Sequence, residues 1–160
     1  MSKDRAMGEV ALQMRMLQQS FDAFDEAAAA MLGLNRTDLR CLDLVLAKEP
    51  MSAGELTTAA KLSPAATTTA IDRLERAGFV TRSRDAANRR RVLVAATEAA
   101  RAAEREVYGP IGEAGMLALR RYGEEQVAVI IDFLETARRV QEEQTTRLRG
   151  LPVRGRTRDR

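Results

Sequence analysis

The chain has 160 residues, of which 45% are apolar and 4% aromatic, and its formal net charge is +3. This length allows one domain with its own hydrophobic core, or two small lobes that share elements, and the many Ala and Leu residues favour a mainly helical protein. Histidine is absent and Cys41 is the only cysteine, which excludes His/Cys metal clusters, Ser-His triads and intramolecular disulfides. We therefore expect no metal, no cofactor and no enzymatic activity.

The charges are unevenly distributed along the chain. Residues 72–91 contain seven arginines against three acidic residues, and residues 147–160 contain six arginines against one aspartate. Two basic segments on an otherwise acidic chain indicate a polyanionic partner that is bound at defined places. The sequence has no apolar run as long as a membrane span, and its N-terminus lacks the apolar core of a signal peptide, so we expect a cytoplasmic protein without a membrane partner.

Apolar residues recur at three- and four-residue steps from about residue 4 to residue 31, which predicts a long N-terminal helix. Its apolar stripe consists of Val10, Met14, Leu17, Phe21, Phe24 and Ala28. Because a small core cannot cover a helix of this length, the stripe favours contact with a partner surface. Lengthwise packing on its own chain remains the alternative.

Two shorter helices are predicted next. Asn35 follows the helix breaker Gly33 and can cap a helix that runs to about Ala47. The buried face of that helix is predicted to consist of Leu39, Leu42, Val45 and Leu46. Ser52 stands three residues before Glu55, the spacing of a capping box, and opens a short helix after the turn at residues 48–50.

The segment from Ser63 to Ala77 predicts a further helix, in which Pro64 suits the first position and Gly78 follows the end. One side is predicted to pack on a core through Thr67, Ala70, Ile71 and Leu74. Together with the short helix and tight turn before it, this helix makes a helix-turn-helix.

The outer face of this helix has the composition of a DNA-reading surface. Its candidate DNA-binding residues are Ser63, Ala65, Thr68, Thr69, Arg73 and Arg76. Small side chains allow close approach to the bases, hydroxyls bond base edges or phosphates, and arginines bond guanine or neutralise phosphates. We expect the first four residues in the major groove and the two arginines nearer the phosphates. A merely solvated helix face has a similar composition and remains the alternative.

A β-hairpin is predicted after Gly78. Residues 79–82 and 91–95 are short β-prone runs joined by a polar, arginine-rich connection. Such a hairpin behind a helix-turn-helix forms a wing that reaches along the duplex. Arg90 is the candidate for insertion into the minor groove, and Arg82, Arg84 and Arg89 are candidates for phosphate contact or wing bracing.

The C-terminal third is again helical in pattern. Thr97 can cap a helix that continues towards residue 122, and Pro110 is expected to bend or interrupt it. Glu124 begins a last helix, whose side predicted to be buried consists of Val127, Ile130, Ile131, Leu134, Ala137 and Val140. Residues 149–160 have no periodicity and are predicted to form a disordered basic tail, which adds non-specific DNA affinity or touches flanking DNA.

The run IDRLERAGFVTRSRDAANRRRVLVAAT, residues 71–97, resembles the MarR family of winged helix-turn-helix regulators. The matching residues are Asp72, Arg73, Leu74, Glu75, Gly78, Val80, Arg82, Arg89, Arg90 and Thr97. The order of elements agrees from about residue 4 to residue 148. The chain departs from the pattern at Asn88, where the family has an acidic residue, at Ala96, where it has leucine, and at Thr69, where a basic residue is common.

The resemblance implies a mainly α fold with a small β-hairpin wing. Residues 1–148 would form a single MarR-like domain, in which residues 35–96 are the winged helix-turn-helix lobe and residues 4–32 and 97–148 supply the dimerisation helices. The expected dimer interface contains Leu17, Phe21, Val127, Ile130 and Leu134. By analogy with the family, Asp72 and Asn88 are wing-positioning residues, and Asp72 pairs with wing arginines.

The resemblance further implies a homodimer that binds double-stranded DNA at a palindromic operator, with half-sites about one helical turn apart. A repressor released by a small aromatic effector is the expected function. Two alternatives remain open at this point. One is a winged-helix scaffold for protein interaction without specific DNA binding, and the other is a redox-sensing regulator that uses Cys41.

Overall fold

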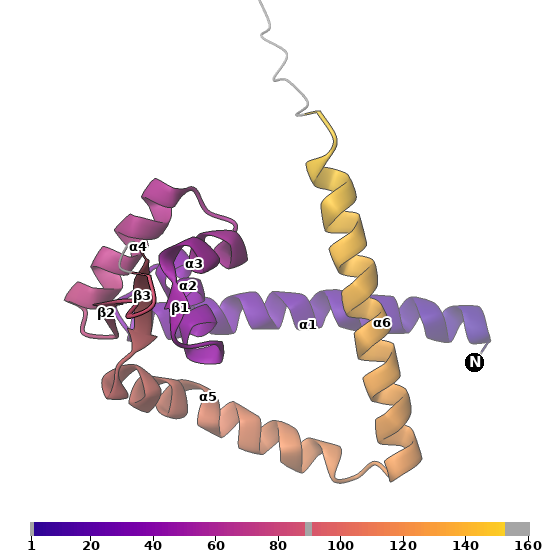
Figure 1. Cartoon of the computed structure of the whole chain (residues 1–160). Coiled ribbons are helices and arrows are strands. Elements are labelled where there is room, and N and C mark those ends of the chain that lie inside the picture. Colours follow the sequence, from indigo (N-terminus) through magenta and orange to yellow (C-terminus); the bar gives the residue numbers. More distant parts are fainter. Residues whose placement is uncertain (1, 89–90, 153–160) are drawn as a thin grey trace, which may run out of the picture. The chain divides into compact units, whose positions relative to one another are not determined.

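The computed structural model describes residues 2–88 and 91–152. The chain divides into two units, Met1–Pro110 and Ile111–Arg160. The elements in chain order are α1 (Lys3–Met31), α2 (Arg36–Ala47), β1 (Met51–Ser52), α3 (Ala53–Ala60), α4 (Pro64–Arg76), β2 (Val80–Arg84), β3 (Val92–Ala96), α5 (Glu98–Leu119) and α6 (Glu124–Arg149) (Figure 1). This mainly helical chain with a small sheet confirms the predicted fold class.

Local capping residues set the starts of the helices, as predicted. The Asn35 side chain accepts a hydrogen bond from the Asp38 backbone N–H (2.9 Å) at the start of α2. The capping box of α3 is complete, because Ser52 Oγ accepts from the Glu55 backbone N–H (3.2 Å) and Glu55 Oε2 accepts from the Ser52 backbone N–H (2.7 Å). Thr97 Oγ1 accepts from a backbone N–H in the first turn of α5.

The main core lies in the first unit, where α2, α3, α4 and the sheet gather (Figure 1). Its largest fully buried side chains include Leu42, Val45, Leu56, Ile71, Leu74, Val80 and Val94. Ala28, Ala29 and Leu39 form a smaller cluster that joins the end of α1 to α2. The predicted core faces of α2 and α4 are therefore confirmed, with Leu46 of α2 half-buried.

The sheet differs from the predicted two-stranded hairpin. Within the described residues it has three antiparallel strands in the order β1-β3-β2. β3 pairs with β2 from Val80↔Ala96 to Arg84↔Val92, and it pairs on its other edge with β1 through Met51↔Val94. The sequence pattern missed β1 because two residues carry no readable alternation. The strands of the hairpin also begin one residue later than expected, at Val80 and Val92.

α5 continues through Pro110, so of the bend or interruption expected at this residue the interruption is not found. A proline removes one backbone hydrogen bond of the helix, while the bonds of the neighbouring turns remain. The boundary between the two units falls at the same residue. At the other end of the second unit, α6 ends at Arg149, and residues 153–160 of the predicted basic tail lie outside the described residues.

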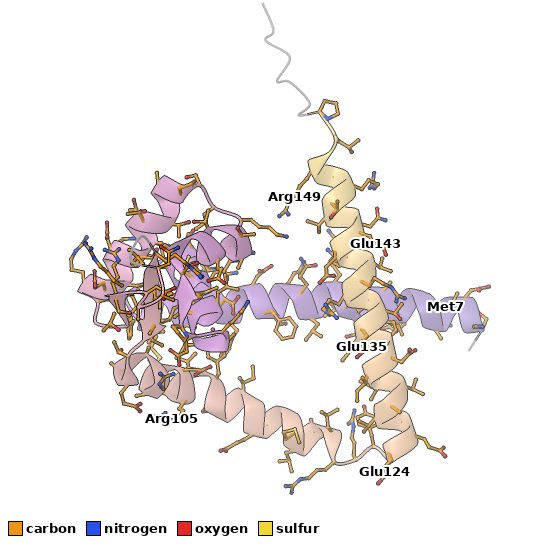
Figure 2. All side chains as sticks on the ribbon, in the orientation of Figure 1. Met7, Arg105, Glu124, Glu135, Glu143 and Arg149 are labelled. Carbon is orange, nitrogen blue, oxygen red and sulfur yellow. The ribbon has the colours of Figure 1, made fainter. Side chains whose placement is uncertain are left out.

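Much of the apolar surface on the long helices is uncovered in the single chain. Leu17 is 48% exposed and Phe21 is 55% exposed, although the end of the same helix is buried at Ala28. In α6 no residue is buried, so the prediction of a buried stripe was wrong for one chain: Val127, Ile130 and Ala137 are half-buried, and Ile131, Leu134 and Val140 are exposed. Figure 2 shows side chains standing out from α6 along its length.

Candidate nucleic-acid interface

α4 presents one buried and one exposed side. Thr67, Ala70, Ile71 and Leu74 are buried, whereas Ser63, Ala65, Thr68, Thr69 and Arg76 are exposed. Ser63 caps the helix by accepting from the Ala66 backbone N–H (3.2 Å). The structure thus brings the small and hydroxyl-bearing candidates together on one surface.

The two exposed threonines use their hydroxyl protons within the helix. Thr68 Oγ1 donates to the Pro64 carbonyl and Thr69 Oγ1 donates to the Ala65 carbonyl, each at 3.0 Å. Each side chain therefore offers an incoming molecule a methyl group and oxygen lone pairs.

Arg73 lies in a different environment from the one expected for a phosphate contact. Its Nε and Nη2 each approach one carboxylate oxygen of Asp38 to 2.6 Å, which is a bidentate ion pair between α4 and α2. Asp38 is only 2% exposed and also accepts from the Asn35 side chain at 2.8 Å. Because Arg73 donates these hydrogen bonds to Asp38, the pKa of Arg73 lies above its ordinary value. This arrangement assigns Arg73 to holding α4 on α2, and sequence reasoning missed Asp38 because it stands 35 residues away.

Asp72 connects α4 to the wing. It forms an ion pair with Arg82 Nη2 of β2, and Nη1 of the same guanidinium lies 3.2 Å from Glu75 Oε2. The pairing predicted for Asp72 with a wing arginine is therefore present. Because Arg82 is bound by two carboxylates of α4, its first effect is to brace the hairpin against that helix.

The wing is also tied to α3, by a residue that sequence reasoning did not single out. Arg91 Nη2 lies 3.2 Å from Glu55 Oε2, and its Nη1 lies 3.7 Å from Asp85 Oδ2. Hydrogen bonds from Ser52 lower the pKa of Glu55, so this carboxyl is held in the charged form that attracts Arg91. The carboxylate of the capping box thus serves both the helix start and the wing.

The tip of the wing is described only in part. Arg84 is exposed at the end of β2, and among the described residues neither Arg84 nor Arg76 forms an ion pair. The Asn88 carbonyl accepts from the Arg91 backbone N–H at 2.8 Å. Arg89 and Arg90, including the candidate for the minor groove, lie outside the described residues.

Comparison with known proteins identifies the family. The profile of the MarR family matches residues 34–92. The chain is 38% identical over 126 residues to the uncharacterized HTH-type transcriptional regulator YcgE of Bacillus subtilis (strain 168), which covers 79% of this chain and 82% of the relative. This chain belongs to the MarR family. It is therefore a DNA-binding transcriptional regulator with a winged helix-turn-helix.

Solved structures agree on the fold. A MarR family protein from Bacillus stearothermophilus has a TM-score of 0.65 at 21% identity, covering 91% of this chain and 99% of that chain. A variant of S. aureus MepR bound to an oligodeoxyribonucleotide has a TM-score of 0.58 at 14% identity, covering 82% of this chain and 97% of that chain. The MarR fold thus extends over most of the chain.

Cys41 is fully buried in the main core of this MarR family member. Burial, together with the nearby charge of Asp38, raises the pKa of the Cys41 thiol above its ordinary value of 9.0. A reactive cysteine needs thiolate character and access to the oxidant. Neither condition is met at this position.

A cavity of about 400 Å³ lies in the first unit beside α2. Its lining consists of Asp25, Arg36, Thr37, Leu39, Arg40, Asp43, Ala60 and Leu62. Burial, and then the charges of Asp25 and Glu104, raise the pKa of Asp43 to about 6. The lining thus combines two arginines and two aspartates with four uncharged residues.

Within residues 2–88 and 91–152, no group of His, Cys, Asp and Glu side chains is suited to hold a metal ion. In the same part of the chain, no helix combines the length and the apolar character needed to cross a membrane.

Proposed function

We propose that this MarR family regulator is a homodimeric repressor that binds a palindromic operator through α4 and the wing. The observation that carries the proposal is the exposed, uncharged first half of α4. Ion pairs of Arg73 and Asp72, in the second half of this helix, connect it to α2 and to the wing. A rigid reading helix with an exposed small-residue face suits the major groove. The related MepR fold bound to an oligodeoxyribonucleotide supports the same use of this fold.

The residues divide into four roles in this proposal. Ser63, Ala65, Thr68 and Thr69 approach the base edges, and the exposed side chains of Arg76 and Arg84 approach the phosphates. Arg73, Asp72, Arg82 and Asn88 position the helix and the wing. Arg90 remains the proposed minor-groove residue and Arg89 a proposed phosphate contact.

The uncovered apolar stripes support the homodimer. In the first unit Leu17 and Phe21 of α1 are exposed, and in the second unit Val127, Ile130 and Leu134 of α6 are exposed or half-buried. Contiguous apolar surface on a soluble protein marks an interaction site. A second copy offers the same stripes with two-fold symmetry. The dimer would place two copies of α4 and the wing on successive turns of a palindromic site.

Release by a small aromatic effector is also proposed from the family likeness. An effector that favours a spacing of the two winged lobes that does not fit successive major grooves would shift the dimer away from the DNA-binding arrangement. Two arginines and two aspartates are among the eight residues that line the cavity beside α2, and an acidic or basic substituent on the aromatic compound would match them.

The proposal is tested by mobility shift and fluorescence anisotropy on the chain's own upstream DNA, with a shuffled duplex of equal composition as competitor. We expect preference for the upstream duplex, a dimer by sedimentation, and repression of a reporter placed downstream. Arg90→Ala should weaken binding and lower its salt dependence while the dimer persists, and Arg5→Ala, an exposed change at the start of α1, is the matched control. Equal affinity for both duplexes, together with tight binding to a protein, would favour the scaffold instead.

A further inference from the structure

The first two turns of α4 carry no side chain that reads guanine through two hydrogen bonds. Residues 63–71 are Ser, Pro, Ala, Ala, Thr, Thr, Thr, Ala and Ile. Bidentate readers of base edges are Arg or Lys for guanine and Asn or Gln for adenine, and none of them occurs in this segment. Since a helix enters the major groove with its N-terminal residues against the bases, the usual hydrogen-bonding code is missing where bases would be contacted.

The arginines nearest to this segment form ion pairs within the protein or lie farther along the helix. Arg73 is held by the buried Asp38 through two bonds of 2.6 Å, and Arg82 is held by Asp72 and Glu75. Arg76 is exposed, but it lies seven residues beyond Thr69, which is about 10 Å along a helix. No side chain of residues 63–71 therefore brings a positive charge to the bases that this segment faces.

The exposed Thr68 and Thr69 can contact a base through only some of their side-chain groups. Their hydroxyl protons are donated to carbonyls of the preceding turn, so methyl groups and oxygen lone pairs remain. In the major groove the apolar feature is the C5-methyl group of thymine, and threonine methyl groups suit contact with it. Guanine presents two acceptors there, which a threonine with a committed proton does not satisfy.

We propose that Thr68 and Thr69 select thymine in each half-site through contact between their methyl groups and the thymine C5-methyl group. This inference rests on the proposed DNA contact of α4 and adds the base that is read. Arg76, Arg84 and the wing then supply affinity through the phosphates, and the threonines supply discrimination between bases.

The test begins with selection of duplexes from a random-sequence library by the full-length protein. The enriched duplex is then remade in two forms, one with deoxyuridine in place of thymine in a half-site and one with 7-deazaguanine in place of guanine. Deoxyuridine removes only the C5-methyl group, and 7-deazaguanine removes only the N7 acceptor. We expect thymine at recurring half-site positions and a loss of about fourfold in affinity for each contacted methyl group, which corresponds to about 0.8 kcal/mol. Replacing guanine should have little effect at positions facing α4.

The matching variant is Thr68→Ser/Thr69→Ser, which keeps both hydroxyls and removes both methyl groups. It should bind the thymine and deoxyuridine duplexes equally, close to the affinity of the unmodified protein for deoxyuridine. Thr58→Ser is the control, because Thr58 is exposed on α3 and also donates to a carbonyl of its own helix. It should discriminate between the two duplexes as the unmodified protein does.

Two results would overturn the thymine contact without affecting the proposed operator binding. Equal affinity of the unmodified protein for the thymine and deoxyuridine duplexes would remove the methyl contact, and discrimination retained by the double serine variant would place it on other residues. A selection that enriches no duplex would count against the proposed operator binding itself, so the two failures are distinguishable.

Discussion

The ion pair between Asp38 and Arg73 allows a specific test of how α4 is held against α2. Asp38 is 2% exposed, receives two bonds of 2.6 Å from Arg73, and accepts a third of 2.8 Å from Asn35. The change Asp38→Asn keeps the size of the side chain. It removes the charge and turns one acceptor oxygen into an NH₂ group that faces a guanidinium donor. We expect this change to loosen α4 on α2.

The magnitude follows from the bonds that are lost. A hydrogen bond to a charged group contributes about 1.5–3 kcal/mol, and here one such bond is lost while the other becomes weaker. The Arg73 side chain is 38% exposed, so water compensates part of the loss. We therefore expect Asp38→Asn to lower the free energy of unfolding by about 2 kcal/mol, which is a decrease in melting temperature of about 4–8 °C for a chain of this size.

The assay is urea unfolding at one fixed protein concentration, applied to Asp38→Asn, Arg73→Gln and the double variant. If the residues act as a pair, the double variant loses less stability than the two single losses added together. Single effects that add to within about 0.5 kcal/mol would refute the reasoning. DNA binding gives a second criterion, because a positioning role for Arg73 leaves the salt dependence of affinity unchanged. A decrease of about one in its slope would instead mean that Arg73 contacts a phosphate.

Three other outcomes are expected. Folding raises the pKa of Asp43 from 3.8 to about 6, so the stability lost by ionising this carboxyl grows as the pH rises from about 4 to about 6 and is complete above that. Asp43→Asn should therefore raise the free energy of unfolding by about 1–3 kcal/mol at pH 7.5 and hardly at all at pH 4. An equal gain at both pH values, or the same gain in the exposed control Glu106→Gln, would contradict this. Leu134→Glu should convert the proposed dimer to monomer in sedimentation, and an intact dimer would argue against α6 as the interface. Arg84→Ala should reduce the slope of log affinity against log salt by about one, whereas an unchanged slope would exclude a phosphate contact at this position.

Features that depend on neighbouring residues could be predicted from the sequence. The start of α4 at Ser63 and Pro64, the capping box of Ser52 with Glu55, and the cap at Asn35 each need groups only three residues apart, and all were confirmed. The buried faces of α2 and α4 follow from helical spacing alone. The motif from residue 71 to residue 97 indicated the family, which the comparisons then established.

Contacts between residues far apart in the sequence were decided only by the tertiary structure. Three such contacts join segments more than 30 residues apart: Asp38 with Arg73, Arg91 with Glu55, and β1 with β3. No periodic pattern in the sequence predicts them. The sequence alone determined where α4 begins and which of its faces is buried, since capping and amphipathic spacing are local. Folding decided which arginine of α4 forms an ion pair within the protein. The buried carboxylate of Asp38, which belongs to the distant helix α2, binds the guanidinium of Arg73.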